Sequence, residues 1–156
     1  MRRKDREITG LDEKLALLKD RKVCRLGISL HDEPYIVPLN FGWTFADNAL
    51  TLYFHSAKEG KKTDIMRANP RACFEVDCNH ALIRADTACK YGFRFTSLIG
   101  FGNITFIENQ EEKRLALNVL MRHQTGEDKP FDFTDAEIDA VSVFKLSVNE
   151  WTGKGR

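Results

Sequence analysis

The sequence predicts a mainly β protein, a small antiparallel β-barrel of six strands with peripheral helices. Apolar and polar residues alternate in six separate segments, short turns join several of them, and 156 residues suffice for one sizeable core. Apolar residues make up 42% of the chain and charged residues 30%, which disfavours a disordered or fibrous protein. We expect residues 1–156 to form one domain, with residues 1–8 as a loose N-terminal arm.

The first half of the chain changes from a helical period to a strand period. A short helix is expected to open at residues 9–12, because Leu11, Leu15 and Leu18 then share one face. Alternation predicts strands at residues 23–30, 35–41 and 50–55. The turns between them are short, so the three strands are predicted to form an antiparallel meander.

The second half mixes helices and strands. Ser56 and Glu59 have the spacing of a capping box, which predicts a helix from Ser56 to about Asn69, before Pro70. Two more helices are expected, one from Asn109 to about Gly126 and a short one at Thr134. The remaining predicted strands are residues 72–78, 91–107 with a bend at Gly100 or Gly102, and 141–150, followed by a tail at 151–156. Closing six strands into a barrel would protect the two edges of an open sheet.

The charge balance and the length of the apolar runs disfavour two classes of partner, nucleic acids and membranes. The net charge is +1, from 24 basic and 23 acidic side chains, so no nucleic-acid partner is expected. No apolar run approaches the roughly 20 residues of a membrane span, and no apolar stretch follows the charged first residues. We therefore expect a cytoplasmic protein that neither carries a secretory signal nor enters a membrane.

The cysteines do not form a recognisable metal motif. The four lie at positions 24, 73, 78 and 89, without a C-x-x-C pair. Cys78, His80 and Cys89 could be drawn as three zinc ligands, but their spacing matches no standard site and a fourth ligand is missing. No metal is expected.

The most informative segment is residues 54–62, where a strand is followed by a helix. Lys58, Lys61 and Lys62 fall in the first turns of that helix, where the helix dipole disfavours cations. A bound anion such as a phosphate would explain their presence, because free N–H groups gather at a helix N-terminus. The alternative is a solvated basic face. The segment lacks the glycine and lysine spacing of a nucleotide-binding P-loop.

Pro38 interrupts a predicted strand. Proline cannot donate a hydrogen bond and belongs at an edge or a bulge, so the backbone from Val37 to Asn40 is expected to lack one neighbour. These groups could meet a planar ligand with hydrogen-bonding edges, or the segment could be a plain edge strand. Gly100 and Gly102 likewise permit either a close approach by a ligand or a bend of the barrel.

His55 alternates away from Leu52 and Phe54, so it is predicted to face away from the core. It could hydrogen-bond a ligand or transfer a proton, or it could simply be an exposed strand end. In the tail, Trp151 beside Lys154 and Arg156 could stack on a ring and hold an anion, or could belong to a frayed terminus.

Taken together, these segments resemble the flavin-binding split barrels of the pyridoxamine 5′-phosphate oxidase superfamily, and within it the branch of nitroimidazole-resistance proteins. No single motif decides the resemblance, but the set is specific and keeps the family's order along most of the chain. The matching segments are Lys22–Gly27, Tyr35–Phe41, Tyr53–Lys62, Asn69–Phe74, Ile99–Gly102 and Trp151–Lys154.

The resemblance implies a six-stranded antiparallel FMN-binding split barrel that holds FMN at a homodimer interface. By this resemblance the flavin ring lies along one strand, the ribityl chain and phosphate reach the strand-to-helix segment, and the partner chain covers the ring. The ring strand corresponds to Val37, Pro38, Leu39 and Asn40, the phosphate segment to His55, Ser56, Ala57, Lys61 and Lys62, and the covering residues to Ser97 and Trp151. Other members of the superfamily bind haem or a deazaflavin.

We therefore expect an FMN-dependent oxidoreductase that transfers electrons or hydride to a small molecule, with NADH or NADPH as a donor. His55 is the candidate catalytic residue, placed by the resemblance at the flavin edge. Oxidation of pyridoxamine phosphate is not expected, because no second set of basic residues is evident and the tail differs. Two alternatives are a non-catalytic protein that binds or stores flavin and a small barrel that binds nucleic acid.

Overall fold

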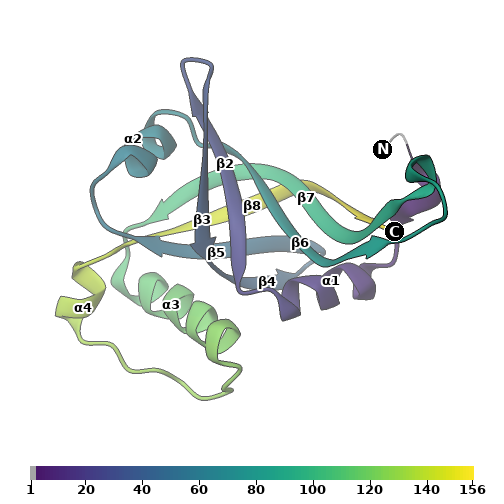
Figure 1. Ribbon diagram of the computed structural model, residues 1–156. Helices are drawn as coiled ribbons and strands as arrows, with labels where there is room; N and C mark the ends of the chain where they lie inside the picture. The colour runs from purple at the N-terminus through teal and green to yellow at the C-terminus, as the bar shows by residue number, and fades with distance from the viewer. Residues whose placement is uncertain (1–2) are drawn as a thin grey trace.

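The computed structural model describes residues 3–156. In this part of the chain, eight antiparallel strands form one sheet whose two end strands are consecutive in the chain (Figure 1). The order across the sheet is β3-β2-β6-β7-β8-β5-β4, and the short β1 pairs with β8. The strands are β1 (Glu7–Ile8), β2 (Val23–Leu30), β3 (Glu33–Asn40), β4 (Gly42–Ala46), β5 (Ala49–Ser56), β6 (Arg71–Ile83), β7 (Gly92–Ile107) and β8 (Ser142–Gly155).

The chain turns between the two end strands at Phe41, whose side chain is completely buried. β4 pairs with β5 and β3 pairs with β2, so the predicted three-stranded meander is wrong. The sheet therefore curls into a barrel whose end strands are joined by the chain but not by a backbone ladder. At Gly42 helix α3 approaches so closely that a Cβ atom would lie 2.5 Å from the Cα of Leu120.

The core lies inside this barrel, and alternation along the strands fills it. Cys24, Leu26 and Ile28 of β2 point inward, as the period of two predicts. A second apolar cluster lies on the outside of the barrel, under the helices that follow β7; it consists of Ile107, Ala116, Leu117, Ile138 and Val143.

Among the described residues, four α-helices lie on the periphery: α1 (Leu11–Asp20), α2 (Lys61–Ala68), α3 (Gln110–Thr125) and α4 (Asp135–Asp139). The predicted ends of α3 are confirmed, because the Asn109 side chain caps its first turn and Gly126 ends it in the left-handed conformation, at φ 77°. No helix among residues 3–156 has the length and apolar character needed to cross a membrane.

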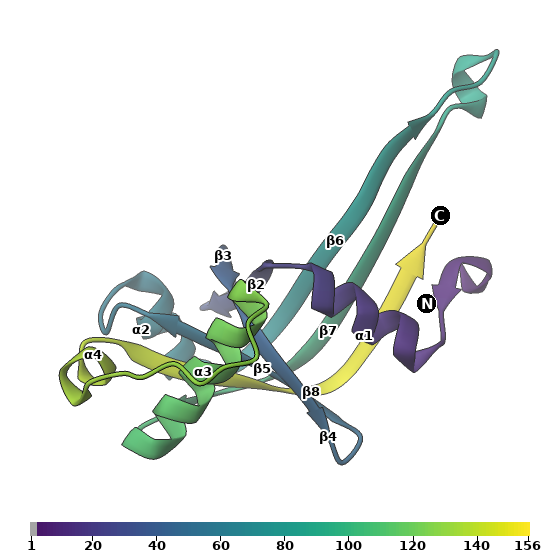
Figure 2. The ribbon, with the colours of Figure 1, turned by 90° about the horizontal axis from the view of Figure 1, so that it is seen from below.

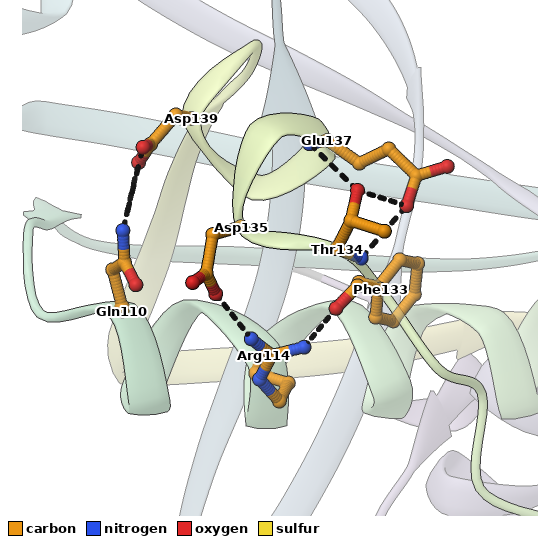
Figure 3. Close-up of polar contacts among 7 residues, drawn as sticks. All are labelled: Gln110, Arg114, Phe133, Thr134, Asp135, Glu137 and Asp139. Atoms are coloured by element: carbon orange, nitrogen blue, oxygen red, sulfur yellow. Dashed lines mark hydrogen bonds and ion pairs between the residues drawn. The ribbon is translucent and has the colours of Figure 1, made fainter.

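Arg114 ties α4 to α3 (Figure 3). Its guanidinium group donates to the carbonyl oxygen of Phe133 and forms an ion pair of 2.9 Å with Asp135. The predicted start of α4 is confirmed by a capping box between Thr134 and Glu137. The backbone and hydroxyl hydrogen bonds from Thr134 lower the pKa of the Glu137 carboxyl. These contacts close the outer apolar cluster from one side.

The β6–β7 hairpin extends far from the barrel, and the end of β8 runs beside β7 (Figure 2). The bend predicted at Gly100 or Gly102 is confirmed by an irregularity in the β7–β8 register between Phe101 and Gly102. The tail is not frayed, because β8 continues to Gly155. Residues 1–8 were predicted to form a loose arm, but Glu7 and Ile8 pair with this last part of β8. The prediction is therefore wrong for the residues after Arg6. Residues 1 and 2 lie outside the described residues.

Candidate functional site

β3 is the edge strand predicted around Pro38. Its backbone ladder is with β2 alone, where Arg25 lies opposite Pro38. An antiparallel strand offers alternate backbone groups to each side, so the other side of β3 presents N–H and C=O groups that no strand among residues 3–156 pairs. The side chains that point away from the barrel are those of Ile36, Pro38 and Asn40, while Val37 and Leu39 pack against the core.

The turn between β5 and α2 leaves the start of the helix without a side-chain cap. The predicted capping box is wrong, because α2 begins at Lys61 with Gly60 as its N-cap. The hydroxyl of Ser56 donates instead to the carbonyl oxygen of Ala57, at 2.8 Å. Gly60 adopts φ 130°, a conformation that side chains rarely permit, and so sets the direction from which the helix starts.

Lys61 connects the start of α2 to the start of β3. Its ammonium group lies 2.9 Å from the Glu33 carboxylate and 5.1 Å from the centre of the Tyr35 ring. The ion pair raises the pKa of Lys61 and lowers the pKa of Glu33. A cavity of about 380 Å³ opens beside this pair, lined also by His31 and Asp64. The predicted anion segment and the predicted ring strand are therefore neighbours in space.

Thr63 provides a second polar group in the first turn of α2. Its side chain is 1% exposed, and its hydroxyl oxygen has no hydrogen-bond partner within the described chain. An unsatisfied buried hydroxyl is costly, so it marks a place where a further polar partner would be stabilising. Lys62 precedes it and is half-buried.

His55 lies near the end of β5, opposite Val143 of β8. As predicted, it points away from the core, since the preceding Phe54 is completely buried and His55 is exposed. Partial desolvation lowers the pKa of its imidazole, which favours the neutral form. A neutral imidazole can donate and accept a hydrogen bond at the same time.

Ser97 and Trp151 are not brought to β3 within one chain. They belong to β7 and β8, and β2 and β6 separate those strands from β3. Trp151 lies opposite Gly100 and packs on the core, and the ammonium group of Lys14 lies 4.3 Å from the centre of its ring.

A charged network that the sequence analysis did not identify lies beside the edge strand. Arg25 contacts Glu75 at 3.0 Å and Asp77 at 2.6 Å, and Asp77 also contacts His80 at 3.0 Å. Desolvation raises the pKa of Glu75, against the lowering effect of Arg25. Alternation places Arg25, Glu75 and Asp77 on the outward face, but only the strand register reveals that they meet.

Exposed apolar side chains share this outward face. Cross-strand partners lie on the same face of a sheet, and the register places Pro38, Arg25, Glu75, Ile99 and Thr152 in one row across five strands. A neighbouring row contains Ile36, which is 69% exposed, and Phe101, which is 39% exposed. The outward face therefore combines exposed apolar side chains with the charged network of Arg25, Glu75 and Asp77.

This arrangement defines a class of protein, the split barrel. Its sheet curls into a barrel, but no backbone ladder joins the two end strands, here β3 and β4. Residues 11–155 match the family described as pyridoxamine 5′-phosphate oxidase. The chain belongs to this family. No curated protein matches it.

Solved structures with the same fold include several proteins with redox cofactors in their names. A candidate 5-nitroimidazole antibiotic resistance protein from Bacteroides thetaiotaomicron is 34% identical; the alignment covers 96% of this chain and 86% of that one, with a TM-score of 0.82. The flavocytochrome Anf3 from Azotobacter vinelandii is 19% identical, with coverages of 100% and 72% and a TM-score of 0.81. The FAD and heme binding protein from Mycobacterium smegmatis is 20% identical, with coverages of 96% and 73% and a TM-score of 0.79.

Proposed function

We propose that the protein binds FMN between two copies of the chain and uses it as a cytoplasmic oxidoreductase acting on a small molecule. Membership of the pyridoxamine 5′-phosphate oxidase family supports flavin binding, as do the cofactors in the names of its structural neighbours. The observation that carries the proposal is the ion pair between Lys61 and Glu33. It joins an unpaired edge strand to an uncapped helix start, which are the two surfaces that a flat ring with an anionic tail requires.

The residues present fit such a cofactor. The orphaned hydroxyl of Thr63 and the half-buried Lys62 lie in a helix turn whose first N–H groups are uncapped, which suits a phosphate. Backbone groups from Val37 to Asn40 would hold the ring, and His55, Ser56 and Ala57 would adjoin the chain that links ring and phosphate. When bound, FMN supplies hydride or single-electron transfer, and the protein orients it.

A shared site is supported by the outward face of the sheet. Ile36, Ile99 and Phe101 expose apolar area there, and burying it against a second copy would be favourable. The same contact would let Ser97 and Trp151 of one chain reach β3 of the other. Size-exclusion chromatography with light scattering should therefore find a dimer, and a monomer that retains the cofactor would contradict the shared site.

His55 is the side chain proposed to act at the cofactor. Its neutral imidazole can hold or pass a proton at a ring nitrogen while the backbone around it stays fixed in the β5–β8 ladder. Within residues 3–156, no other histidine lies at the junction of β5 and the α2 turn.

Cofactor identity is tested by purifying the protein, recording its visible spectrum and measuring the mass of the released chromophore. FMN should be found, and titration of the apoprotein should give tighter binding of FMN than of FAD, haem or a deazaflavin. A preparation that remains colourless after incubation with each of these compounds would refute the proposal.

Catalysis is tested separately by mixing the loaded protein with NADH or NADPH and then with a nitroaromatic acceptor. Reduction of the bound flavin followed by reoxidation over many cycles would support an oxidoreductase. Flavin that binds tightly but is reduced by neither nicotinamide would instead favour the alternative, a protein that stores or carries flavin.

A further inference from the structure

The corner between β3 and β4 is held by a histidine from α3. The carbonyl oxygen of Phe41 accepts from His123 Nδ1 at 2.6 Å and from Gln124 Nε2 at 2.8 Å. The other ring nitrogen of His123 lies 3.1 Å from the carbonyl oxygen of Leu18 and 3.3 Å from that of Lys19. One imidazole ring therefore connects the end of α1, the end of β3 and the end of α3.

All the hydrogen-bond partners of this ring are carbonyl oxygens, which can only accept. The ring can therefore act only as a donor to them, from the nitrogen that carries the hydrogen. Leu18 and Lys19 lie in the last turn of α1, where backbone carbonyl oxygens lack partners within the helix.

Charged groups surround the ring from each neighbouring segment. The ammonium group of Lys22 contacts the carbonyl oxygen of His123 itself. The ring also faces a cavity of about 580 Å³, whose charged lining comprises Lys19 and Asp20 of α1, Lys22, Arg122 of α3, and Glu127 and Asp128 after it. Acidic and basic groups balance in number there, so the carbonyl oxygens in direct contact dominate the environment of the ring.

The neighbouring amide side chains extend the same contact to the edge strand. The Asn40 side chain donates to the carbonyl oxygen of Lys22 at 3.1 Å and to Gln124 Oε1 at 3.0 Å. Gln124 in turn donates to the carbonyl oxygen of Lys22 at 3.0 Å. The side chain of Asn40 thus connects the end of β3 to Gln124 of α3 and to Lys22.

We propose that His123 is a positioning residue for the edge strand β3. It fixes the corner at Phe41, so the backbone from Val37 to Asn40 is already ordered when the ring of the cofactor arrives. Removal of the ring would leave the carbonyl oxygen of Phe41 with Gln124 as its side-chain partner and loosen the end of β3. This role rests on the proposed function in so far as it concerns FMN, whereas the anchoring is a property of the protein alone.

The first test uses the protein without cofactor. Amide exchange in β3, corrected for the intrinsic rate, should be faster in His123→Gln than in the wild type, while exchange in β7 stays the same. Unchanged protection of β3 in this variant would overturn the proposal even if FMN binds.

The second test measures FMN dissociation constants at one neutral pH. His123→Gln should bind FMN roughly tenfold more weakly than the wild type. His123→Lys should keep most of the wild-type affinity, because its ammonium group can donate to the same carbonyl oxygens.

Arg114→Gln is the matched control, because it loosens α3 from α4 without touching the corner at Phe41. It should keep both the FMN affinity and the β3 amide exchange of the wild type. Equal effects of Arg114→Gln and His123→Gln would show that His123 acts only through general stability and would refute the positioning role. If the wild type binds no flavin, the proposed function fails, while the exchange of β3 still decides whether His123 anchors it.

Discussion

Arg25 and Pro38 lie opposite each other across β2 and β3, on the outward face of the sheet. Proline offers no N–H group here, and Arg25 turns to the carboxylates of Glu75 and Asp77 on its other side. The edge strand therefore has a charged network beside it that is fixed by β6. This network contains more acid than base, which has consequences for stability.

Glu75→Gln should stabilise the protein at neutral pH. Burial raises the pKa of the Glu75 carboxyl, so its ionised form is disfavoured in the folded state. The contribution of Glu75 to stability is present below the ordinary glutamate pKa and is lost as pH rises through the raised value. The free energy of unfolding of the variant should thus exceed that of the wild type by less than about 1 kcal/mol near pH 7, and this difference should vanish in acid.

Urea denaturation across this pH range measures the difference, with the exposed Glu108→Gln as a control that should not change the pH profile. A Glu75→Gln variant that is less stable than the wild type at neutral pH would mean that the ion pair with Arg25 outweighs the cost of desolvation.

Replacing both Lys61 and Lys62 with alanine should weaken FMN retention while leaving the fold intact. Contacts between charged groups contribute about 1.5–3 kcal/mol each, so Lys62→Ala alone should weaken binding by roughly tenfold or more. Lys61→Ala should have a smaller effect, because Lys61 already pairs with Glu33 and must leave that partner to bind a phosphate.

Fluorescence titration with FMN measures these affinities, and thermal unfolding checks the fold. Lys58→Ala is the matched control, since Lys58 is an exposed lysine in the same turn and lies outside α2. Unchanged affinity in the double variant would remove the phosphate site from the start of α2.

His55→Gln should make the protein less sensitive to acid. Desolvation lowers the pKa of His55 in the folded state, so protons bind more readily to the unfolded chain. The stability that neutral His55 provides is present above the unfolded pKa of about 6.5 and is lost as pH falls through the lowered value. The free energy of unfolding of the variant should therefore fall less in acid than that of the wild type, while its flavin turnover should slow. If the free energy of unfolding of both proteins falls equally as the pH is lowered, His55 is not desolvated.

Local patterns predicted most of the secondary structure but not the way the sheet closes. The alternation of Cys24, Leu26 and Ile28 and the helix starts at Asn109 and Thr134 each depend on neighbours in sequence, and each is confirmed. The predicted meander is wrong because β3 does not pair with β5. The direction of the chain beyond Phe41 depends on α3, which lies far along the chain and approaches Gly42 closely. A single residue separates β3 from β4, and alternation continues across it without a signal.

The candidate site was predictable only where one segment carried the information. Pro38 identified an edge, and the lysines identified the start of a helix, although Gly60 rather than Ser56 determines where that helix begins. Lys61 meeting Glu33, and His123 meeting Phe41, are contacts between segments distant in sequence. Nothing local to either residue indicates its partner.

Gly42→Ala should destabilise the protein more than any change at the proposed cofactor site. The added methyl group would lie within 2.7 Å of backbone atoms of Val119 and Leu120, which cannot move without shifting α3 from the barrel. Overpacking of this kind costs about 1–3 kcal/mol. Gly10→Ala is the matched control, because its nearest contact would be an ordinary 3.7 Å. Chemical denaturation should show a clear loss for the first variant and almost none for the second, and equal stabilities would mean that α3 is not seated on Gly42.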